Sequence, residues 1–117
     1  MPFKFESLEI WQMSMDQAEE AHELIKKFPK SEMFGLSSQF QRAADSVSLN
    51  ISEGSINQTN PEQRKFLSYA IRSIAECVTC IHKARRRKYI TQEEFEKFYH
   101  EEEILMAKTL TFKRGVR

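Results

Sequence analysis

The stretch that decides the fold is residues 38–54, SQFQRAADSVSLNISEG, together with the leucine that precedes it at position 36. Its apolar residues recur every three or four positions, which is the spacing of one face of an α-helix. They are Leu36, Phe40, Ala43 or Ala44, Val47 and Ile51. A helix with a continuous apolar face must bury that face against other elements. The stretch therefore predicts a core helix of an all-α protein.

A second row of side chains, all polar, follows the same spacing on a neighbouring face of this predicted helix. We name it the polar ridge and include one glutamate from a later helix: Gln39, Arg42, Ser46, Asn50, Glu53 and Glu76. Most members are side chains that form specific hydrogen bonds, whereas a solvated face usually carries long, flexible charged side chains. Because an unpaired polar group in a dry place costs about 1 to 3 kcal/mol, the polar ridge predicts ordered contacts.

Two partners for the polar ridge stay open at this point. Arg72, Ser73 and Glu76 lie on a later predicted helix and would fix how the two helices meet. The alternative partner is a neighbouring subunit. In either case Arg42 with a glutamate would form a geometrically demanding ion pair of the kind found at buried contacts.

Length and composition favour one helical domain. The chain has 117 residues, of which 40% are hydrophobic and 30% charged, as is ordinary for a globular domain with a substantial core. Only three glycines and three prolines occur, which leaves few turns for a multi-strand sheet. We therefore predict a single all-α domain over residues 1–117.

Start and stop signals divide the chain into four predicted helices, at about residues 8–28, 36–53, 61–88 and 92–112. Ser7 is the predicted cap of the first helix, and Pro29 stops that helix. Gly54 is predicted to be a left-handed residue after the second helix, and Asn60 and Pro61 start the third. A capping box of Thr91 and Glu94 precedes the fourth helix. A polar loop is expected over residues 55–59.

Short connections make consecutive helices antiparallel neighbours, so we predict an up-down-up-down antiparallel four-helix bundle. In the first helix the predicted inward residues are Leu8, Trp11, Met15, Ala18, Ala21 or His22, Ile25 and Phe28. In the fourth they are Phe95, Phe98 or Tyr99, Leu105 or Met106, Thr109 and Phe112.

A basic run ends the third predicted helix: Lys83, Arg85, Arg86, Arg87 and Lys88. The net charge is only +1, so no global field attracts nucleic acid or anionic lipid. The run itself would bind phosphates, and Tyr89 would stack on a base. The alternative is charge balance, because cations favour a helix C-terminus and acidic residues across the turn would neutralise them. Those acidic residues are Glu93, Glu94 and Glu96.

No catalytic or metal-binding constellation is predicted. Glu19 and His22 have the spacing found in di-iron bundles, but such a site needs that motif twice and carboxylates from two more helices. Cys77 and Cys80 lie in mid-helix without a second ligand pair, so they are interpreted as small core residues. Neither a glycine-rich phosphate loop nor a nucleophile motif occurs. We expect no enzyme activity, cofactor, metal or small-molecule substrate.

The sequence also predicts a location. The N-terminal residues MPFKFESLEIW contain acids and lack an apolar core, unlike a secretory signal. No apolar run has the length of a membrane span. Two cysteines in a helical stretch fit reduced thiols in a cytoplasm. We therefore expect a cytoplasmic protein without a membrane partner.

The motifs, taken in order, resemble those of one family. Their residues here are Phe5, Leu8, Ile10 and Trp11; Phe28, Pro29, Glu32, Phe34, Gly35 and Leu36; Ser38, Gln39, Arg42, Ala43 and Ala44; Asn50, Ile51, Glu53 and Gly54; then Phe66, Leu67, Ala70, Ser73, Glu76, Tyr89 and Ile90. This set is similar to the four-helix-bundle proteins encoded in intervening sequences of bacterial large-subunit (23S) ribosomal RNA genes. The departures are Gln41, Ser52, Cys80 and Lys88, where Arg, Ala, Gln and Gly are usual.

The resemblance implies a self-assembling bundle, because members of that family form closed rings of five subunits. We therefore expect a non-enzymatic scaffold or adaptor that is a homo-oligomer, a homopentamer by resemblance. The alternative is an RNA- or DNA-binding module, which the basic run and the family's link to ribosomal RNA genes motivate. In a ring, each weak basic patch would be multiplied.

Overall fold

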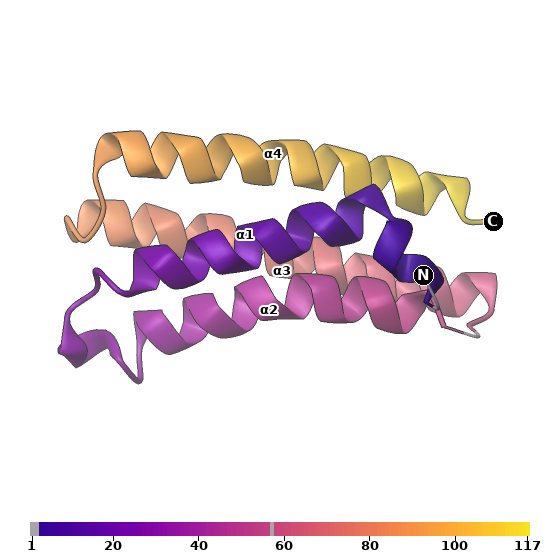
Figure 1. Ribbon diagram of the computed structural model, residues 1–117, viewed down its shortest axis with the longest axis horizontal. Coiled ribbons are helices and arrows are strands. Elements are labelled where there is room, and N and C mark those ends of the chain that lie inside the picture. Colours follow the sequence, from indigo (N-terminus) through magenta and orange to yellow (C-terminus); the bar gives the residue numbers. More distant parts are fainter. Residues whose placement is uncertain (1–2, 57) are drawn as a thin grey trace.

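The computed structural model describes residues 3–56 and 58–117 and confirms an all-α four-helix bundle (Figure 1). The helices are α1 (Glu9–Ile25), α2 (Leu36–Gly54), α3 (Asn60–Arg86) and α4 (Gln92–Gly115). Two short 3-10 helices, η1 (Lys4–Ser7) and η2 (Lys30–Glu32), precede α1 and α2. The bundle measures 43 × 24 × 24 Å.

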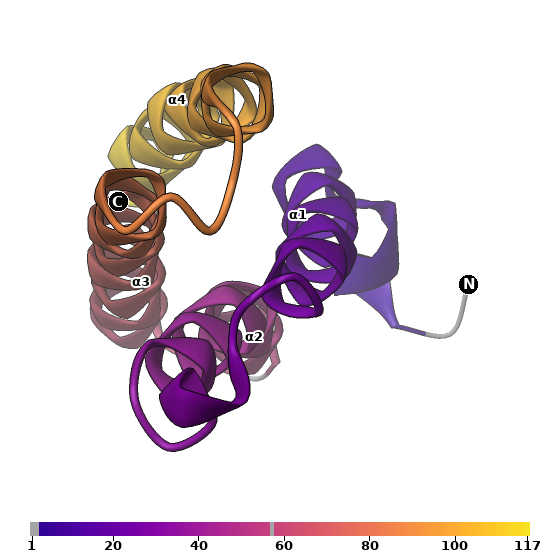
Figure 2. The ribbon, with the colours of Figure 1, turned by 90° about the vertical axis from the view of Figure 1, so that its left-hand side faces the viewer.

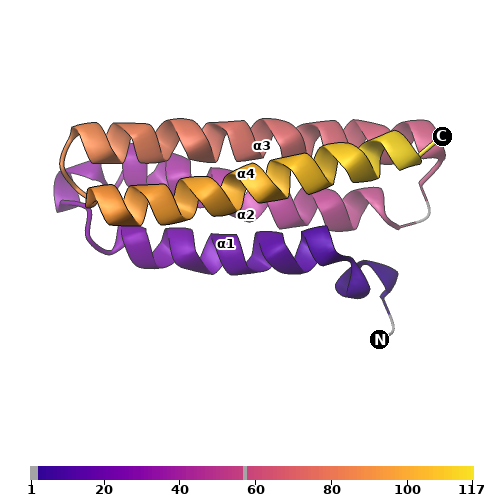
Figure 3. The ribbon, with the colours of Figure 1, turned by 90° about the horizontal axis from the view of Figure 1, so that it is seen from above.

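Seen end-on, the helices occupy four corners in the order α1, α2, α3, α4 (Figure 2). The α1–α2 and α3–α4 connections lie at one end of the bundle, which we call the η2 end (Figure 1). Both chain termini and the α2–α3 connection lie at the opposite end. Residue 57 of the expected polar loop lies outside the described residues. Seen from above, α4 runs obliquely across the other helices (Figure 3).

Two of the predicted helix ends need correction. α1 ends at Ile25 rather than at residue 28, because its last turn tightens: the Phe28 N–H donates to the Ile25 carbonyl at 2.9 Å. α4 continues to Gly115, three residues past the predicted end at Phe112, since no helix breaker precedes that glycine.

The end of α3 differs for a separate reason. The helix stops at Arg86, and Lys88 adopts a φ of 64°, the left-handed region that cannot continue an α-helix. The Tyr89 N–H donates to the Ala84 carbonyl, and the Lys88 N–H to the Arg85 carbonyl, both at 2.9 Å. These two bonds form a Schellman motif, whose left-handed residue is usually glycine. Lys88 therefore stands at a position that favours glycine, as the departure noted in the sequence suggests.

The helix starts confirm one predicted cap and correct two. Thr91 and Glu94 form the predicted capping box, with bonds of 3.1 and 2.9 Å. Thr59, rather than Asn60, caps α3 by accepting the Glu62 N–H at 3.4 Å. Ser7 does not cap α1, because it belongs to η1 and its hydroxyl donates to the Lys4 carbonyl.

Gly54 has a different role from the one predicted. It is the last residue of α2, and no glycine in the described chain has a positive φ. Its missing side chain instead allows α3 to approach, since a Cβ atom here would lie 2.8 Å from the Cβ atom of Phe66. Glycine is used where one backbone must come close to another element.

The core confirms the predicted inward face of α2: all the apolar residues predicted to face inward are buried. For the first predicted helix, the inward face is right at Ala18, Ala21 and Phe28, which are buried, but wrong at Met15. Ser14 and Gln17 are buried there, whereas Met15 is 42% exposed. In the described part of the chain, none of the helices has the length and apolar character needed to cross a membrane.

Candidate functional site

The polar ridge is divided between a helix contact and solvent. Ser46 on α2 donates to Ser73 on α3, with the two hydroxyl oxygens 2.6 Å apart. Asn50 donates from its side-chain amide to the Ser46 carbonyl at 2.8 Å. The Ser46–Ser73 bond therefore joins α2 to α3, as one of the two alternatives proposed, whereas the Asn50 bond lies within α2.

The remaining ridge residues face outward from the single chain. They are Gln39, Arg42, Glu53 and Glu76, all exposed. In residues 3–56 and 58–117, neither Arg42 nor Glu76 takes part in an ion pair within the chain. The expected arginine–glutamate pair is therefore not formed between α2 and α3.

The basic run does not form one surface. Arg85 lies against α4, with its guanidinium carbon 3.9 Å from the centre of the Phe95 ring. Arg87 points to the α1–α2 connection, where it pairs with Glu32 at 2.9 Å. Consecutive helical residues are about 100° apart, so neighbouring arginines cannot share a direction. Two of the five cations are thus occupied by intramolecular contacts.

Besides Arg87, which is exposed but paired with Glu32, three cations of the run are exposed: Lys83, Arg86 and Lys88. Within the described residues, none of their side chains forms a hydrogen bond or ion pair. The predicted stacking role of Tyr89 is not supported, because its hydroxyl donates to Glu32 at 2.7 Å and its ring packs on Phe28. The acidic partner of Arg87 is Glu32, rather than one of the glutamates in the first turns of α4 that were predicted to neutralise the run.

Glu32 joins the α1–α2 connection to the end of α3. Its Oε2 atom accepts from the Tyr89 hydroxyl and from Arg87, and its Oε1 atom accepts the Leu36 N–H at 3.0 Å. The Tyr89 and Leu36 bonds, followed by the charge of Arg87, hold the pKa of Glu32 below its usual value. This carboxylate fixes the backbone of η2 against the bundle.

Directly after this anchored segment, the chain displays two exposed apolar side chains. Phe34 is 93% exposed and Met33 is 54% exposed. They border a shallow cleft of about 350 Å³ that is also lined by Ile25, Ser37, Ser38, Gln41 and Arg42. We call Met33, Phe34 and Arg42 the η2 patch. Aromatic, methionine and arginine side chains are the types enriched in protein interfaces.

The core contains a carboxyl group that the sequence interpretation missed. Glu102 on α4 is 1% exposed and lies beside Gln17 of α1 and Cys77 of α3. Burial raises the pKa of Glu102 to about 7, although the Cys77 thiol and Gln17 amide partly oppose this change. The spacing of residues 95, 98, 102, 105 and 109 places it on the inward face, so the sequence did contain the signal.

The cysteines occupy the positions predicted for them. Cys77 and Cys80 are both buried and free. Burial is the main reason that their pKa values are raised, to about 11 for Cys80. Both thiols therefore stay protonated at neutral pH, which makes them poor nucleophiles and poor metal ligands.

The residues with di-iron spacing do not face the core. Glu19 and His22 are exposed on α1, and His22 Nδ1 is 2.9 Å from Oε1 of Gln41. Among the residues that the structure describes, no three His, Cys, Asp or Glu side chains are grouped to hold a metal ion.

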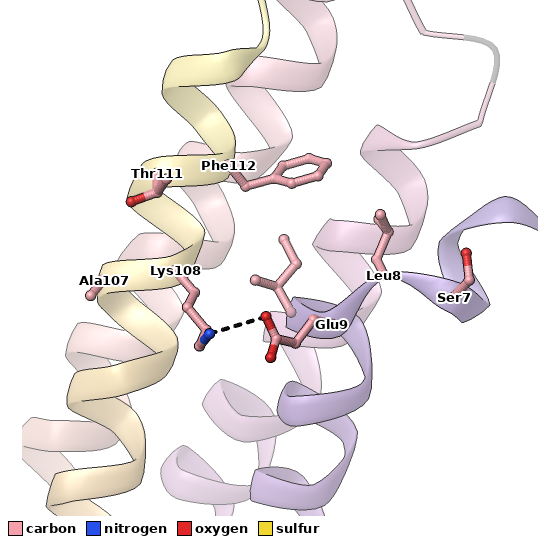
Figure 4. Close-up of a pocket in the computed structure, with 8 residues that line it drawn as sticks. Ser7, Leu8, Glu9, Ala107, Lys108, Thr111 and Phe112 are labelled. Atoms are coloured by element: carbon pink, nitrogen blue, oxygen red, sulfur yellow. Dashed lines mark hydrogen bonds and ion pairs between the residues drawn. The ribbon is translucent and has the colours of Figure 1, made fainter.

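A cleft of about 480 Å³ opens where α1 begins and α4 ends (Figure 4). Leu8, Ile10 and Phe112 contribute apolar walls, and Lys108 reaches across to Glu9 at 3.1 Å. The single ion pair at its mouth is exposed, and no cluster of catalytic side chains lines it. The cleft results from the oblique course of α4 and carries no recognisable chemistry.

Comparisons with known proteins agree with this architecture. A model of the 23S rRNA-intervening sequence protein family matches residues 6–110. The chain is also similar to a crystal structure from Bacteroides thetaiotaomicron, described as a protein of unknown function from the S23 ribosomal protein family. That match has a TM-score of 0.82 and 21% identity, and it covers 89% of this chain and 97% of the other. At this identity the likeness shows the fold alone. No curated protein matches the chain.

Proposed function

The chain belongs to the 23S rRNA-intervening sequence protein family, and from this premise we propose that it is a non-enzymatic scaffold that assembles from several copies of itself. The family resemblance favours a ring of five. The observation that carries the proposal is the 93% exposure of Phe34. An apolar side chain of this size gains free energy by leaving water, at about 25 cal/mol per Å² buried.

The setting of Phe34 supports an interface role over simple surface exposure. Glu32, two residues earlier, is bonded to Tyr89, Arg87 and Leu36. The segment that presents the ring is therefore already ordered, so binding through it loses little conformational entropy. Arg42, which has no ion pair in the described chain, borders the same cleft and offers a charge to a partner.

Light scattering coupled to gel filtration tests the assembly. At micromolar concentration, the wild type is expected to have a mass that is a multiple of 13.8 kDa, and five times that mass if the resemblance holds. A variant with Met33→Ser and Phe34→Ser is expected to shift towards a single chain while keeping its helical circular dichroism, because neither side chain is in the core.

Ile104→Ser is the matched control, since it removes an exposed apolar side chain from α4, away from the η2 patch. It is expected to leave the mass unchanged. A wild type that is monomeric overturns the scaffold proposal. If the wild type is oligomeric and the double variant keeps the same mass, the η2 patch is not the contact between copies, although the protein still assembles.

A second candidate function, RNA or DNA binding, is favoured by one observation. Lys83, Arg86 and Lys88 are exposed and have no side-chain partner in the described residues, and Lys30 lies at the same end of the bundle. Unpaired cations are the groups that exchange condensed counterions for contact with phosphates. The near-zero net charge means that such binding would depend on this end alone.

Fluorescence anisotropy with labelled single-stranded RNA and DNA tests this candidate. Binding is expected at 50 mM salt and is expected to weaken steeply by 200 mM. The variant Lys83→Glu, Arg86→Glu, Lys88→Glu is expected to abolish it. The matched control is Arg64→Glu with Lys65→Glu, which changes exposed cations at the opposite end of α3. The absence of wild-type binding at low salt eliminates this function.

A further inference from the structure

Glu102 occupies an unusual position between α1, α3 and α4. It is 1% exposed, and its neighbours Cys77 and Gln17 are 0% and 6% exposed. In the described part of the chain, the Oε2 atom of Glu102 and the Nε2 atom of Gln17 have no hydrogen-bond partner. Leaving polar atoms buried and unpaired costs free energy, and more so for a charge.

The surroundings of Glu102 do not supply a positive charge. The charged groups that act on Glu102 are Glu20 on α1 and Glu101 on α4, and both oppose its ionisation. Lys97 lies between those two, at 2.9 Å from Glu20 and 3.1 Å from Glu101. On the α3 side, Glu102 meets the neutral Cys77 thiol. No ion pair within residues 3–56 and 58–117 includes Glu102.

Grooves lie on both sides of α4 at this level. The groove towards α1 has a volume of about 220 Å³ and is lined by Met13, Asp16, Gln17, Glu101 and Ile104. The groove towards α3 has a volume of about 270 Å³ and mainly apolar walls, and it is lined by Ile74, Ala75, Val78, Tyr99, Glu102, Glu103 and Met106. Glu102 therefore borders this groove, but the residue is only 1% exposed and its Oε2 atom is buried while α4 is docked.

Outside this layer, α4 is held by apolar packing and by ion pairs to α1. Phe98 packs edge-on against Phe40 of α2, and Leu105 belongs to one buried cluster with Ile10 of α1. Besides the Lys97–Glu20 pair, Lys108 bonds to Glu9 at 3.1 Å and Lys27, just past α1, pairs with Glu94. All three pairs are partly exposed, and such pairs typically contribute 0 to about 1 kcal/mol each. Outward movement of α4 would break these pairs and leave the bond between α2 and α3 intact.

We propose that Glu102, Gln17 and Cys77 form a protonation-dependent latch that keeps α4 docked while the carboxyl is neutral and releases α4 when it ionises. On release, water hydrates the carboxylate, and the buried faces of α1, α3 and α4 that pack around it become accessible. The latch is a property of the single chain and does not depend on the proposed assembly.

The direction of the pH effect follows from linkage. Burial raises the pKa of Glu102 from its ordinary 4.5 to about 7 in the docked state, and hydration on release returns it towards the ordinary value. The released state therefore holds fewer protons between these two values, so release becomes tenfold more favourable for each pH unit in that window. Below the window both states are protonated, and above it the effect is constant.

Hydrogen–deuterium exchange of the full chain at pH 5.5 and 7.5, corrected for the intrinsic exchange rates, tests the latch. In the wild type, amides of α4 are expected to lose roughly twentyfold in protection over this interval, while amides of α2 change little. Glu102→Gln is expected to remove the loss in α4. Glu103→Gln is the matched control, because it neutralises the adjacent, exposed carboxylate of the same helix and should behave as the wild type.

Two results would overturn the latch. In the first, α2 and α4 lose protection in parallel in the wild type, which would mean that ionisation unfolds the whole chain. In the second, Glu102→Gln keeps the wild-type pH dependence of α4. If that variant does not fold, the comparison of α2 with α4 in the wild type decides the question alone.

Discussion

The seam between α2 and α3 and the seam between α1 and α4 join antiparallel helices by different means. Across the first, Gly54 lets the helix backbone approach Phe66, and Ile51 packs in one cluster with Leu67 and Ile74. Across the second, Ile10 and Leu105 belong to the same cluster, but exposed ion pairs lie outside and the polar residues Gln17 and Glu102 interrupt the apolar contact inside. Apolar burial stabilises at every pH and salt concentration, whereas charges stabilise only under some conditions. The stability of the α2/α3 seam therefore depends little on pH and salt, whereas that of the α1/α4 seam depends on both.

The largest effect is expected from Ile51→Ala in the α2/α3 seam. Ile51 is fully buried, so its truncation leaves a cavity and is expected to lower the free energy of unfolding by about 4 kcal/mol. Urea denaturation followed by circular dichroism measures this loss. Ile104→Ala at the edge of the α1/α4 seam is the control, with an expected loss below about 1 kcal/mol. Equal losses from the two truncations would contradict the contrast between the seams.

Glu102→Gln in the α1/α4 seam is expected to stabilise the protein, in contrast to the truncation of Ile51. The side chain keeps its shape but cannot ionise. At pH 8 the free energy of unfolding of the variant is therefore expected to exceed that of the wild type by up to about 3 kcal/mol. Because the pKa of Glu102 is raised by burial to about 7, the wild type loses stability as the pH rises from 4.5 towards 7. At pH 4 the two proteins should be nearly equal. An advantage of the same size at pH 4 and pH 8 would exclude ionisation as its cause.

Gly54→Ala tests the closeness of the α2/α3 seam. The added Cβ atom would lie 2.8 Å from the Phe66 Cβ atom, which forces the helices apart and is expected to cost about 2 kcal/mol. Thermal unfolding at fixed pH measures the cost. Gly115→Ala is the control, because a Cβ atom there meets nothing within 4 Å. A stabilised Gly54→Ala protein would mean that the close approach is not a constraint.

The smallest effect is expected from Lys97→Gln in the α1/α4 seam. Its ion pairs with Glu20 and Glu101 are exposed on the lysine side, so the loss should be about 0.5 kcal/mol and should vanish in 0.5 M salt. Denaturation at two salt concentrations measures it. A loss of several kcal/mol that persists at high salt would show that the seam depends on this lysine after all.

The sequence was sufficient for the parts of the fold that rest on apolar periodicity. The inward face of α2 follows from spacing alone, whereas the number of helices and the capping box at Thr91 follow from local start and stop signals. The inward face of α1 was misplaced at Met15, because Met15 is apolar and Ser14 and Gln17 are not, although these two are the buried residues. Where the core accepts polar side chains, apolar periodicity points to the wrong face.

The candidate sites could be predicted less well. The basic run looked continuous in the sequence, but helical rotation sends Arg85 and Arg87 to different neighbours. Glu32 was not foreseen as the partner of Arg87, because an ion pair across 55 positions of sequence depends on how the α1–α2 connection folds back.

The placement of the chain ends has a practical consequence. Both termini lie at the end of the bundle opposite the η2 patch (Figure 1), along a molecule 43 Å in length. An affinity tag, a fluorophore or a fused reporter attached at either terminus would project away from Phe34. Mass measurements and binding assays on labelled protein should therefore report the behaviour of an unobstructed η2 patch.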